Sequence, residues 1–235
     1  MPIYLLSTEL VFPPPELAEP EGLLAVGGDL SIDRLLLAYK MGIFPWYSEG
    51  EPILWWSPDP RMVLFPSEIH IPQRLQRILR QGRFKITFDK AFSRVIEECA
   101  AVRQEKGQGT WITQDMMQAY TNLHLAGYAH SAEAWYRNKL VGGVYGVALG
   151  QVFFGESMFS RVSNSSKAAF VTLVENLRHW GFRLIDCQVS TQHLARFGAR
   201  EIPRKHFLEI LRDLSDKPSN APAPHWTTNI KNLTR

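Results

Sequence analysis

Residues 139–167 read KLVGGVYGVALGQVFFGESMFSRVSNSSK, and the predicted fold is built around this segment. Two apolar runs in it are separated by the dipeptide Gly150-Gln151. Glycine at the first of two central residues is typical of a type II′ turn, so residues 145–149 and 152–159 are predicted to pair as antiparallel strands. A long helix is expected to follow over residues 167–181.

One carboxylate, Glu156, lies inside the second apolar run. Side chains alternate along a strand, so Glu156 is expected to share a face with Phe154 and Met158. An acid on an apolar face needs a cation, a hydrogen-bond donor or a proton, because an unpaired buried charge is too costly. A binding or catalytic site is the simplest explanation, and a buried structural ion pair is the alternative.

A second strand with polar residues is predicted over 182–190, FRLIDCQVS. Strand alternation places Asp186 and Gln188 on one face and Cys187 on the other. If this strand lies beside the Glu156 strand, as the single helix between them permits, the three polar side chains converge on one pocket. Two carboxylates in one place either bind a cation or handle a proton.

The order of the predicted elements indicates an α+β fold with a mixed central sheet. Strand, helix, strand, short helix and strand follow one another, an order similar to that of the N-acetyltransferase-like fold. Enzymes of that fold that use acyl-coenzyme A place a glycine-rich turn before the crossing helix, where backbone N–H groups hold the pyrophosphate. Here the connection is SRVSNSSK, without glycine, which argues against coenzyme A as a donor.

The chain is predicted to divide into a small amino-terminal domain, residues 1–61, and a catalytic domain, residues 62–235. Its polar tail, 215–235, is expected to be partly flexible. The segment 43–61 is rich in tryptophan and proline, and its aromatic side chains either pack as a lid or stack on planar ligands.

A basic helix is predicted over residues 71–83, IPQRLQRILRQGR. Its arginines recur every three residues and therefore lie near one face. Such a run is usually a solvated surface, and the functional alternative is a phosphate-binding patch. The residues concerned are Arg74, Arg77, Arg80 and Arg83.

Composition excludes several classes of protein. The 235 residues carry a net charge of only +3, so a surface for polyanions must be a local patch. The two cysteines form neither a disulfide framework nor metal-ligand spacing, and the histidines are scattered, so no metal or cofactor is expected. The cysteine pattern suits a reducing cytosol, and no run of 18 apolar residues occurs, so we expect a cytoplasmic protein that is neither secreted nor membrane-spanning. We also expect a monomer.

Eight motifs extend this picture, and together they resemble one family. They are GLLAVGGDLS, GIFPWY, ILWWSPDPR, GTWIT, AHSAEAW, LVGGVYGVALG, FFGESMFS and LIDCQV. In this order and at these distances they are similar to the leucyl/phenylalanyl-tRNA–protein transferases, over about residues 3–212. So many motifs in register are far more specific than one short motif.

The resemblance implies an enzyme that moves leucine or phenylalanine, and less readily methionine, from tRNA to the α-amine of a protein beginning with Arg or Lys. The product would be marked for degradation by the N-end rule pathway. Ester aminolysis is downhill and requires neither ATP nor a metal. The family's Asp–Gln proton relay corresponds to Asp186 and Gln188, and its other site carboxylate corresponds to Glu156. Both acids would face the cationic terminus of the acceptor.

The resemblance also implies a donor site. Trp46 and Trp111 would contact the terminal adenosine, and a soft Met158 would admit both Leu and Phe. The basic helix would bind the tRNA. The residues implied for aminoacyl-adenosine binding are Tyr39, Trp46, Trp111, Val144, Val147, Phe153, Met158, Phe170 and Ile185.

Three alternative functions are also compatible with these residues. One is a thiol–acyl enzyme using Cys187 and His193, against which strand alternation argues because Cys187 would point away from Gln188. Another is an acyltransferase of the same fold with a small-molecule acceptor. The third is a non-catalytic RNA-binding module, in which the tryptophans and arginines bind and the acids only pair with them.

Overall fold

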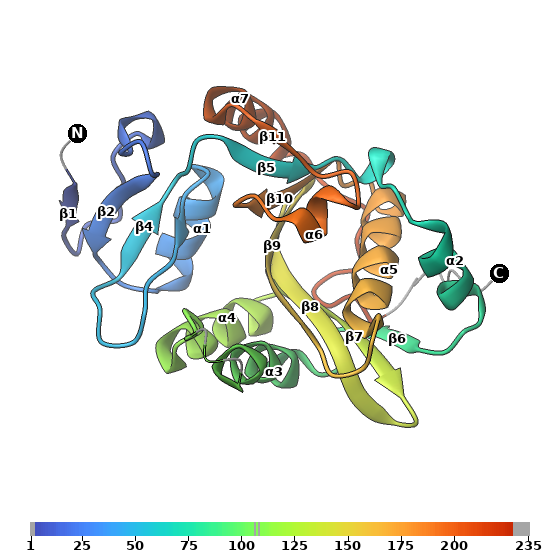
Figure 1. Cartoon of the computed structure of the whole chain (residues 1–235). Helices are drawn as coiled ribbons and strands as arrows, with labels where there is room; N and C mark the ends of the chain where they lie inside the picture. Colours follow the sequence, from blue (N-terminus) through green and yellow to red (C-terminus); the bar gives the residue numbers. More distant parts are fainter. Residues whose placement is uncertain (1–2, 106, 108, 228–235) are drawn as a thin grey trace.

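The structure is a computed structural model and describes residues 3–105, 107 and 109–227. These described residues form a four-stranded sheet of order β1-β2-β4-β3 and a seven-stranded sheet of order β11-β5-β10-β9-β8-β7-β6. The small sheet comes from the beginning of the chain and lies at one side of the large sheet (Figure 1).

Two strands of the small sheet lie in the tryptophan- and proline-rich segment 43–61, for which the sequence predicted no strands: β3 (Phe44–Pro45) and β4 (Leu54–Trp56). Its other strands are β1 (Tyr4–Leu6) and β2 (Leu23–Gly27), accompanied by the 3-10 helix η1 (Pro15–Leu17) and α1 (Ile32–Lys40). Ser31 caps α1 by accepting the Arg34 N–H.

The large sheet and its helices make up the rest of the described chain. The strands are β5 (Arg61–Leu64), β6 (Lys85–Phe88), β7 (Ala129–Tyr136), β8 (Lys139–Leu149), β9 (Val152–Ser160), β10 (Leu184–Gln188) and β11 (Arg200–Ile202). The helices are η2 (Pro66–Glu68), α2 (Gln73–Arg80), α3 (Phe92–Glu105), α4 (Gln114–Leu125), α5 (Ser165–His179), α6 (Gln192–Ala195) and α7 (Arg204–Leu214).

The central hairpin is confirmed. Strands β8 and β9 pair antiparallel across a turn in which Gly150 has φ of 56°, a value that glycine adopts easily. Strand β10 lies parallel to β9, with α5 as the connection between them. The mixed α+β architecture is therefore as predicted.

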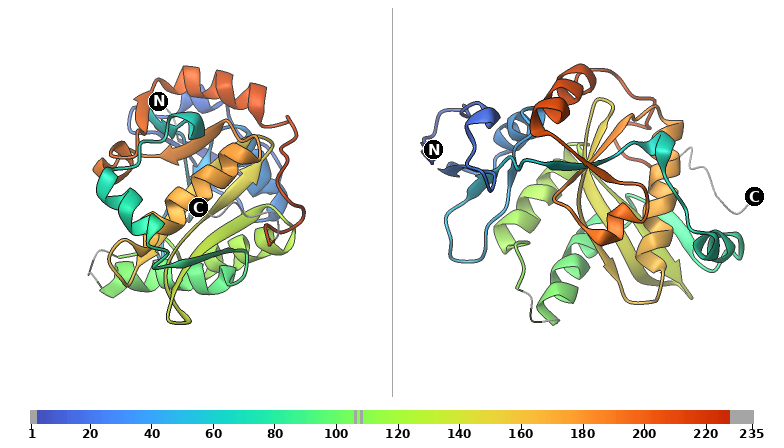
Figure 2. Two further views of the ribbon diagram at one scale, coloured as in Figure 1. Left: turned by 90° about the vertical axis from the view of Figure 1, so that its right-hand side faces the viewer. Right: turned by 45° about the horizontal axis from the view of Figure 1, so that its top comes forward.

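Helices cover both faces of the large sheet, α5 on one and α3 with α4 on the other (Figures 1 and 2). The core on the α3 side continues to the small sheet and α1, where it includes Leu24 of β2 and Leu35 and Tyr39 of α1. The division at residue 61 remains a prediction, since the two sheets share this continuous core. No helix among the described residues combines the length and apolar character needed to cross a bilayer.

A β-bulge changes the predicted faces of β9. Tyr145 lies opposite Ser157 while Gly146 lies opposite Gly155, so Glu156 is the extra residue. An extra residue reverses the alternation beyond it. Phe154 therefore packs in the core on the α3 side, whereas Met158 packs on the α5 side, and the prediction that the two share a face is wrong.

The described part of the tail packs against the core on the α5 side, and its flexibility remains a prediction. Trp226 is buried, and its ring stacks on His130 with the centroids 3.8 Å apart. Its backbone N–H donates to Asp89 Oδ2 at 2.7 Å. Residues 228–235 lie outside the described part of the chain.

Candidate active site

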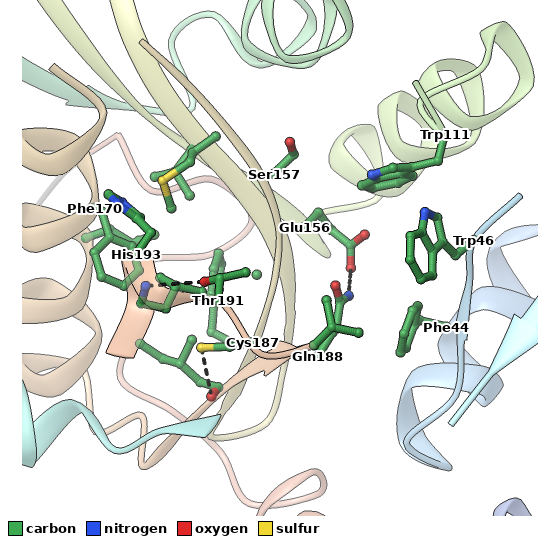
Figure 3. Close-up of a pocket in the computed structure, with 18 of the residues that line it drawn as sticks. Phe44, Trp46, Trp111, Glu156, Ser157, Phe170, Cys187, Gln188, Thr191 and His193 are labelled. Atoms are coloured by element: carbon green, nitrogen blue, oxygen red, sulfur yellow. Dashed lines mark hydrogen bonds between the residues drawn. The ribbon is translucent and has the colours of Figure 1, made fainter. Parts of the chain in front are cut away.

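A cavity of about 360 Å³ opens where β9 and β10 stop pairing. The two strands pair only from Val152 to Phe154 and from Leu184 to Asp186. The residues that follow on each strand line the cavity, together with side chains of β3, α5 and α6. In Figure 3 Glu156 and Gln188 lie between Phe44, Trp46 and Trp111 on one side and Phe170 and His193 on the other.

Seven of the nine residues predicted for the donor site line this cavity: Trp46, Trp111, Val144, Phe153, Met158, Phe170 and Ile185. Val147 does not, because it lies three residues after Val144 and therefore on the opposite face of β8, in the core on the α3 side. Tyr39 lies behind the cavity wall, where its hydroxyl contacts Glu156.

Glu156 accepts three hydrogen bonds from buried donors. The hydroxyl of Tyr39 donates to Oε1 at 2.8 Å and that of Tyr120 to Oε2 at 3.0 Å. Gln188 Nε2 donates to Oε1 at 2.9 Å. Burial raises the pKa of Glu156 to about 7, although the tyrosine hydrogen bonds act in the opposite direction. A carboxyl group with this pKa is suited to exchange protons near neutral pH.

Of the two predicted acids only Glu156 lines the cavity, and Asp186 does not. Its carboxylate is fully buried and makes a bidentate pair with Arg61, from Nε to Oδ1 at 2.8 Å and from Nη2 to Oδ2 at 2.7 Å. Sequence reasoning missed Arg61. The sequence did hold an indication, because Arg61 directly precedes the apolar run Met62–Phe65, and a charge buried with such a run needs a partner.

Gln188 has φ of 62°, in the left-handed region that non-glycine residues seldom adopt. The pairing of β10 with β5 shifts between Asp186 and Gln188, which marks a bulge at Cys187. Asp186 Oδ1 accepts the Gln188 backbone N–H at 2.9 Å. Since Nε2 donates to Glu156, the Gln188 side-chain carbonyl oxygen remains as the acceptor for a ligand.

The bulge also overturns the argument from alternation against a thiol mechanism. Cys187 and His193 both line the cavity together with Gln188. Burial, and after it the neighbouring Asp186 carboxylate, raises the pKa of the Cys187 thiol well above its ordinary value. A nucleophilic cysteine needs a lowered pKa, so the chemistry of the site, and not the strand geometry, disfavours this alternative.

The predicted basic cluster is exposed on α2 and the turn after it. Arg74, Arg77, Arg80 and Arg83 all face solvent, while Leu75 anchors the helix in the core. The guanidinium of Arg83 also lies over the rings of Phe84 and Tyr136. Helix α2 packs along α5, outside the large sheet (Figure 1).

Among the described residues, Asp89, His124 and His225 bring potential metal ligands within 4.8 Å of one another, away from the cavity. Their wide separation in sequence gave no sign of this cluster. The Asp89 carboxylate already accepts the backbone N–H groups of Ser131 and Trp226. These bonds occupy oxygens that a metal would need, so we assign no metal here.

Comparison with known proteins identifies the family. Residues 28–59 match the model of the leucyl/phenylalanyl-tRNA protein transferase N-terminal domain, and residues 63–212 match that of leucyl/phenylalanyl-tRNA protein transferase. The protein of that name from Syntrophobacter fumaroxidans is 59% identical over 91% of each chain. The one from Syntrophotalea carbinolica is 60% identical over 94% of this chain and 96% of its own.

Solved structures add little to this result. A conserved protein of unknown function from Bacteroides thetaiotaomicron superposes with a TM-score of 0.42 and 10% identity, over 68% of this chain and 57% of that one. So distant a likeness bears on neither fold nor function. The family models and the close relatives are decisive, and the chain belongs to the leucyl/phenylalanyl-tRNA–protein transferases, a family of aminoacyltransferases.

Proposed function

We propose that this protein forms a peptide bond by transferring leucine or phenylalanine, and less readily methionine, from aminoacyl-tRNA to the α-amine of a protein beginning with Arg or Lys. The observation that carries the proposal is a carboxyl group with a pKa of about 7, Glu156, hydrogen-bonded to Gln188 in the wall of an otherwise largely apolar cavity. Apolar walls suit the aminoacyl side chain, and a proton acceptor near neutrality suits the amine.

The apolar end of the cavity is the proposed place of the donor side chain. Phe153, Met158 and Phe170 line it, and the flexible thioether of methionine adapts to side chains as different as Leu and Phe. At the other side, Trp46 is 42% exposed and lies near Trp111 (Figure 3). Exposed aromatic rings are the usual platforms for a terminal base of RNA.

The proposed reaction is the attack of a neutral α-amine on the ester carbonyl carbon of the aminoacyl-tRNA. The C–N bond forms, the bond to the ribose oxygen breaks, and the amine loses one proton while the ribose hydroxyl gains one. An α-amine has a pKa of about 8, so a fair fraction is neutral at physiological pH. Glu156 receives the proton from the amine, while the Gln188 carbonyl oxygen orients that amine. Asp186 acts behind them as an orienting group.

We also propose a fold assignment and a cellular role for the protein. The crossing of α5 between parallel β9 and β10 supports assignment of the large sheet to the N-acetyltransferase-like fold. Acceptor selectivity for Arg or Lys is attributed to Glu156. We further propose that the enzyme works as a cytoplasmic monomer and supplies substrates to the N-end rule pathway.

A transfer assay tests the proposal directly. The purified protein is incubated with radiolabelled Leu-tRNA or Phe-tRNA and two peptides that differ only in an amino-terminal Arg or Ala. Label is expected on the Arg peptide alone. Val-tRNA serves as the donor control, because its Cβ branching should exclude it. Label on neither peptide, with aminoacyl-tRNA binding retained, contradicts the proposed function.

The basic cluster is expected to bind the tRNA body. Changing Arg74, Arg77 and Arg80 together to Ala should weaken tRNA binding and reduce the slope of log K against log salt by ~0.7–0.9 for each phosphate that the variant no longer neutralises. Filter binding over a series of salt concentrations measures both. Lys205→Ala, at another exposed cation, is the matched control. An unchanged slope in the triple variant would show that this face is only a solvated surface.

A further inference from the structure

We propose that Arg61 is a positioning residue of the reaction, which acts through Asp186 to hold Gln188 in its unusual backbone conformation. The inference deepens the proposed function and rests on it. Arg61 and Asp186 come from neighbouring antiparallel strands, β5 and β10, and both side chains are almost fully buried.

The geometry of the Arg61 guanidinium is set from three directions. Two of its nitrogens bind the two oxygens of Asp186 in parallel. Its Cζ atom lies over the rings of Phe44 and Phe207, 4.8 and 4.7 Å from their centroids. Ring contacts of this kind and a bidentate pair both suit the planar, delocalised group of arginine.

Asp186 connects Arg61 to Gln188 through hydrogen bonds. Its Oδ1 accepts hydrogen bonds from Arg61 Nε at 2.8 Å and from the Gln188 backbone N–H at 2.9 Å. The second bond stabilises Gln188 at its φ of 62°. Without a fixed carboxylate, Gln188 would lose the hydrogen bond that offsets the strain of a left-handed conformation in a residue other than glycine. Its side chain would then no longer point toward Glu156.

The same cation supports the opposite wall of the cavity. Phe44, which stacks on Arg61, lines the cavity, and so do Pro45 and Trp46 after it on the chain. Strand β3 belongs to the small sheet and β10 to the large one, so Arg61 joins the part of the site expected to bind the donor to the part expected to perform the chemistry.

Arg61→Lys distinguishes the pairing of Arg61 with Asp186 from its packing against Phe44. Lysine keeps a buried positive charge and an aliphatic stem between the two rings, but it has no fork to bind both oxygens of Asp186. We expect kcat for transfer to fall at least tenfold, while KM for aminoacyl-tRNA stays within threefold of the wild-type value. Arg34→Lys is the matched control, because Arg34 on α1 is equally buried and pairs with Asp29, and the kcat of this variant should not change.

A double-variant comparison distinguishes positioning from a general structural effect. In a Gln188→Ala background, Arg61→Lys should lower the remaining transfer less than twofold, because the residue that Arg61 positions is already gone. Multiplication of the two losses would overturn the proposal. So would a folded Arg61→Lys protein with a kcat within twofold of the wild type.

If Arg61→Lys does not fold, as judged by circular dichroism, Phe207→Leu tests the same role. It retains the ion pair and removes one of the two ring faces that hold the guanidinium. A severalfold loss of kcat that disappears in the Gln188→Ala background supports the proposal, and an unchanged kcat overturns it. Absence of transfer by the wild-type protein would instead contradict the proposed function, so the two failures are distinguishable.

Discussion

Replacement of Asp186 by Ala is expected to lower the free energy of unfolding by about 3–5 kcal/mol, because it leaves a buried guanidinium without its partner. Arg61 is 1% exposed and Asp186 is not exposed at all, so water cannot solvate the remaining charge. Urea denaturation followed by circular dichroism measures the change. Loss of transfer in this variant would therefore reflect loss of fold as well as of chemistry.

Two controls isolate the cause. The double variant Arg61→Met with Asp186→Leu removes both charges and should recover most of the lost stability, since a buried pair is often replaceable by apolar residues of similar volume. Asp29→Ala removes a carboxylate that pairs with Arg34 but is 52% exposed, and it should cost no more than about 1 kcal/mol. A cost below about 1 kcal/mol for Asp186→Ala itself would show that the pair is not buried as described.

Glu156→Gln is expected to reduce the transfer rate roughly 100-fold at pH 7.5, the usual scale for loss of a positioned general base. The fold should persist, because the amide is isosteric and its oxygen still accepts one of the two tyrosine hydroxyls. Single-turnover transfer of labelled leucine measures the rate. Ser157→Ala, at the next residue along the cavity wall, is the control and should retain most activity. A Glu156→Gln rate near that of the wild type would exclude Glu156 as the proton acceptor.

The pH dependence of stability gives an independent test of Glu156. Its pKa is raised by burial to about 7 from 4.5, so the folded state holds the proton more tightly than the unfolded state. The stability from this carboxyl group is fully present below pH 4.5 and is lost as the pH rises through about 7. Because one pKa unit corresponds to about 1.4 kcal/mol, the wild type should lose roughly 3 kcal/mol over this range relative to Glu156→Gln.

The central secondary structure of the molecule could be predicted from local sequence patterns. The Gly150-Gln151 turn and the β8–β9 hairpin follow from turn residues and apolar patterns, and both are confirmed. The sequence permitted β10 to lie beside β9, and the structure places it there, parallel to β9. The convergence of Glu156 and Gln188 was also predictable, because isolated polar residues in apolar strands must find partners.

The details of the site depend on long-range structure. Two bulges, at Glu156 and at Cys187, reverse the alternation of side chains, so Cys187 enters the cavity that strand parity excluded it from. A bulge is a property of two paired strands and leaves no reliable mark in either one alone.

The order of the elements, the hairpin and the polar residues that line the cavity could be predicted from local sequence, because turn preference and apolar periodicity act over a few residues. Which of the two acids lines the cavity depends on contacts between distant parts of the chain. Arg61 lies 125 residues before Asp186, and their pairing buries the Asp186 carboxylate away from the cavity that Glu156 lines. Burial and hydrogen bonding depend on groups that folding brings together, and these contacts give two similar carboxylates different surroundings.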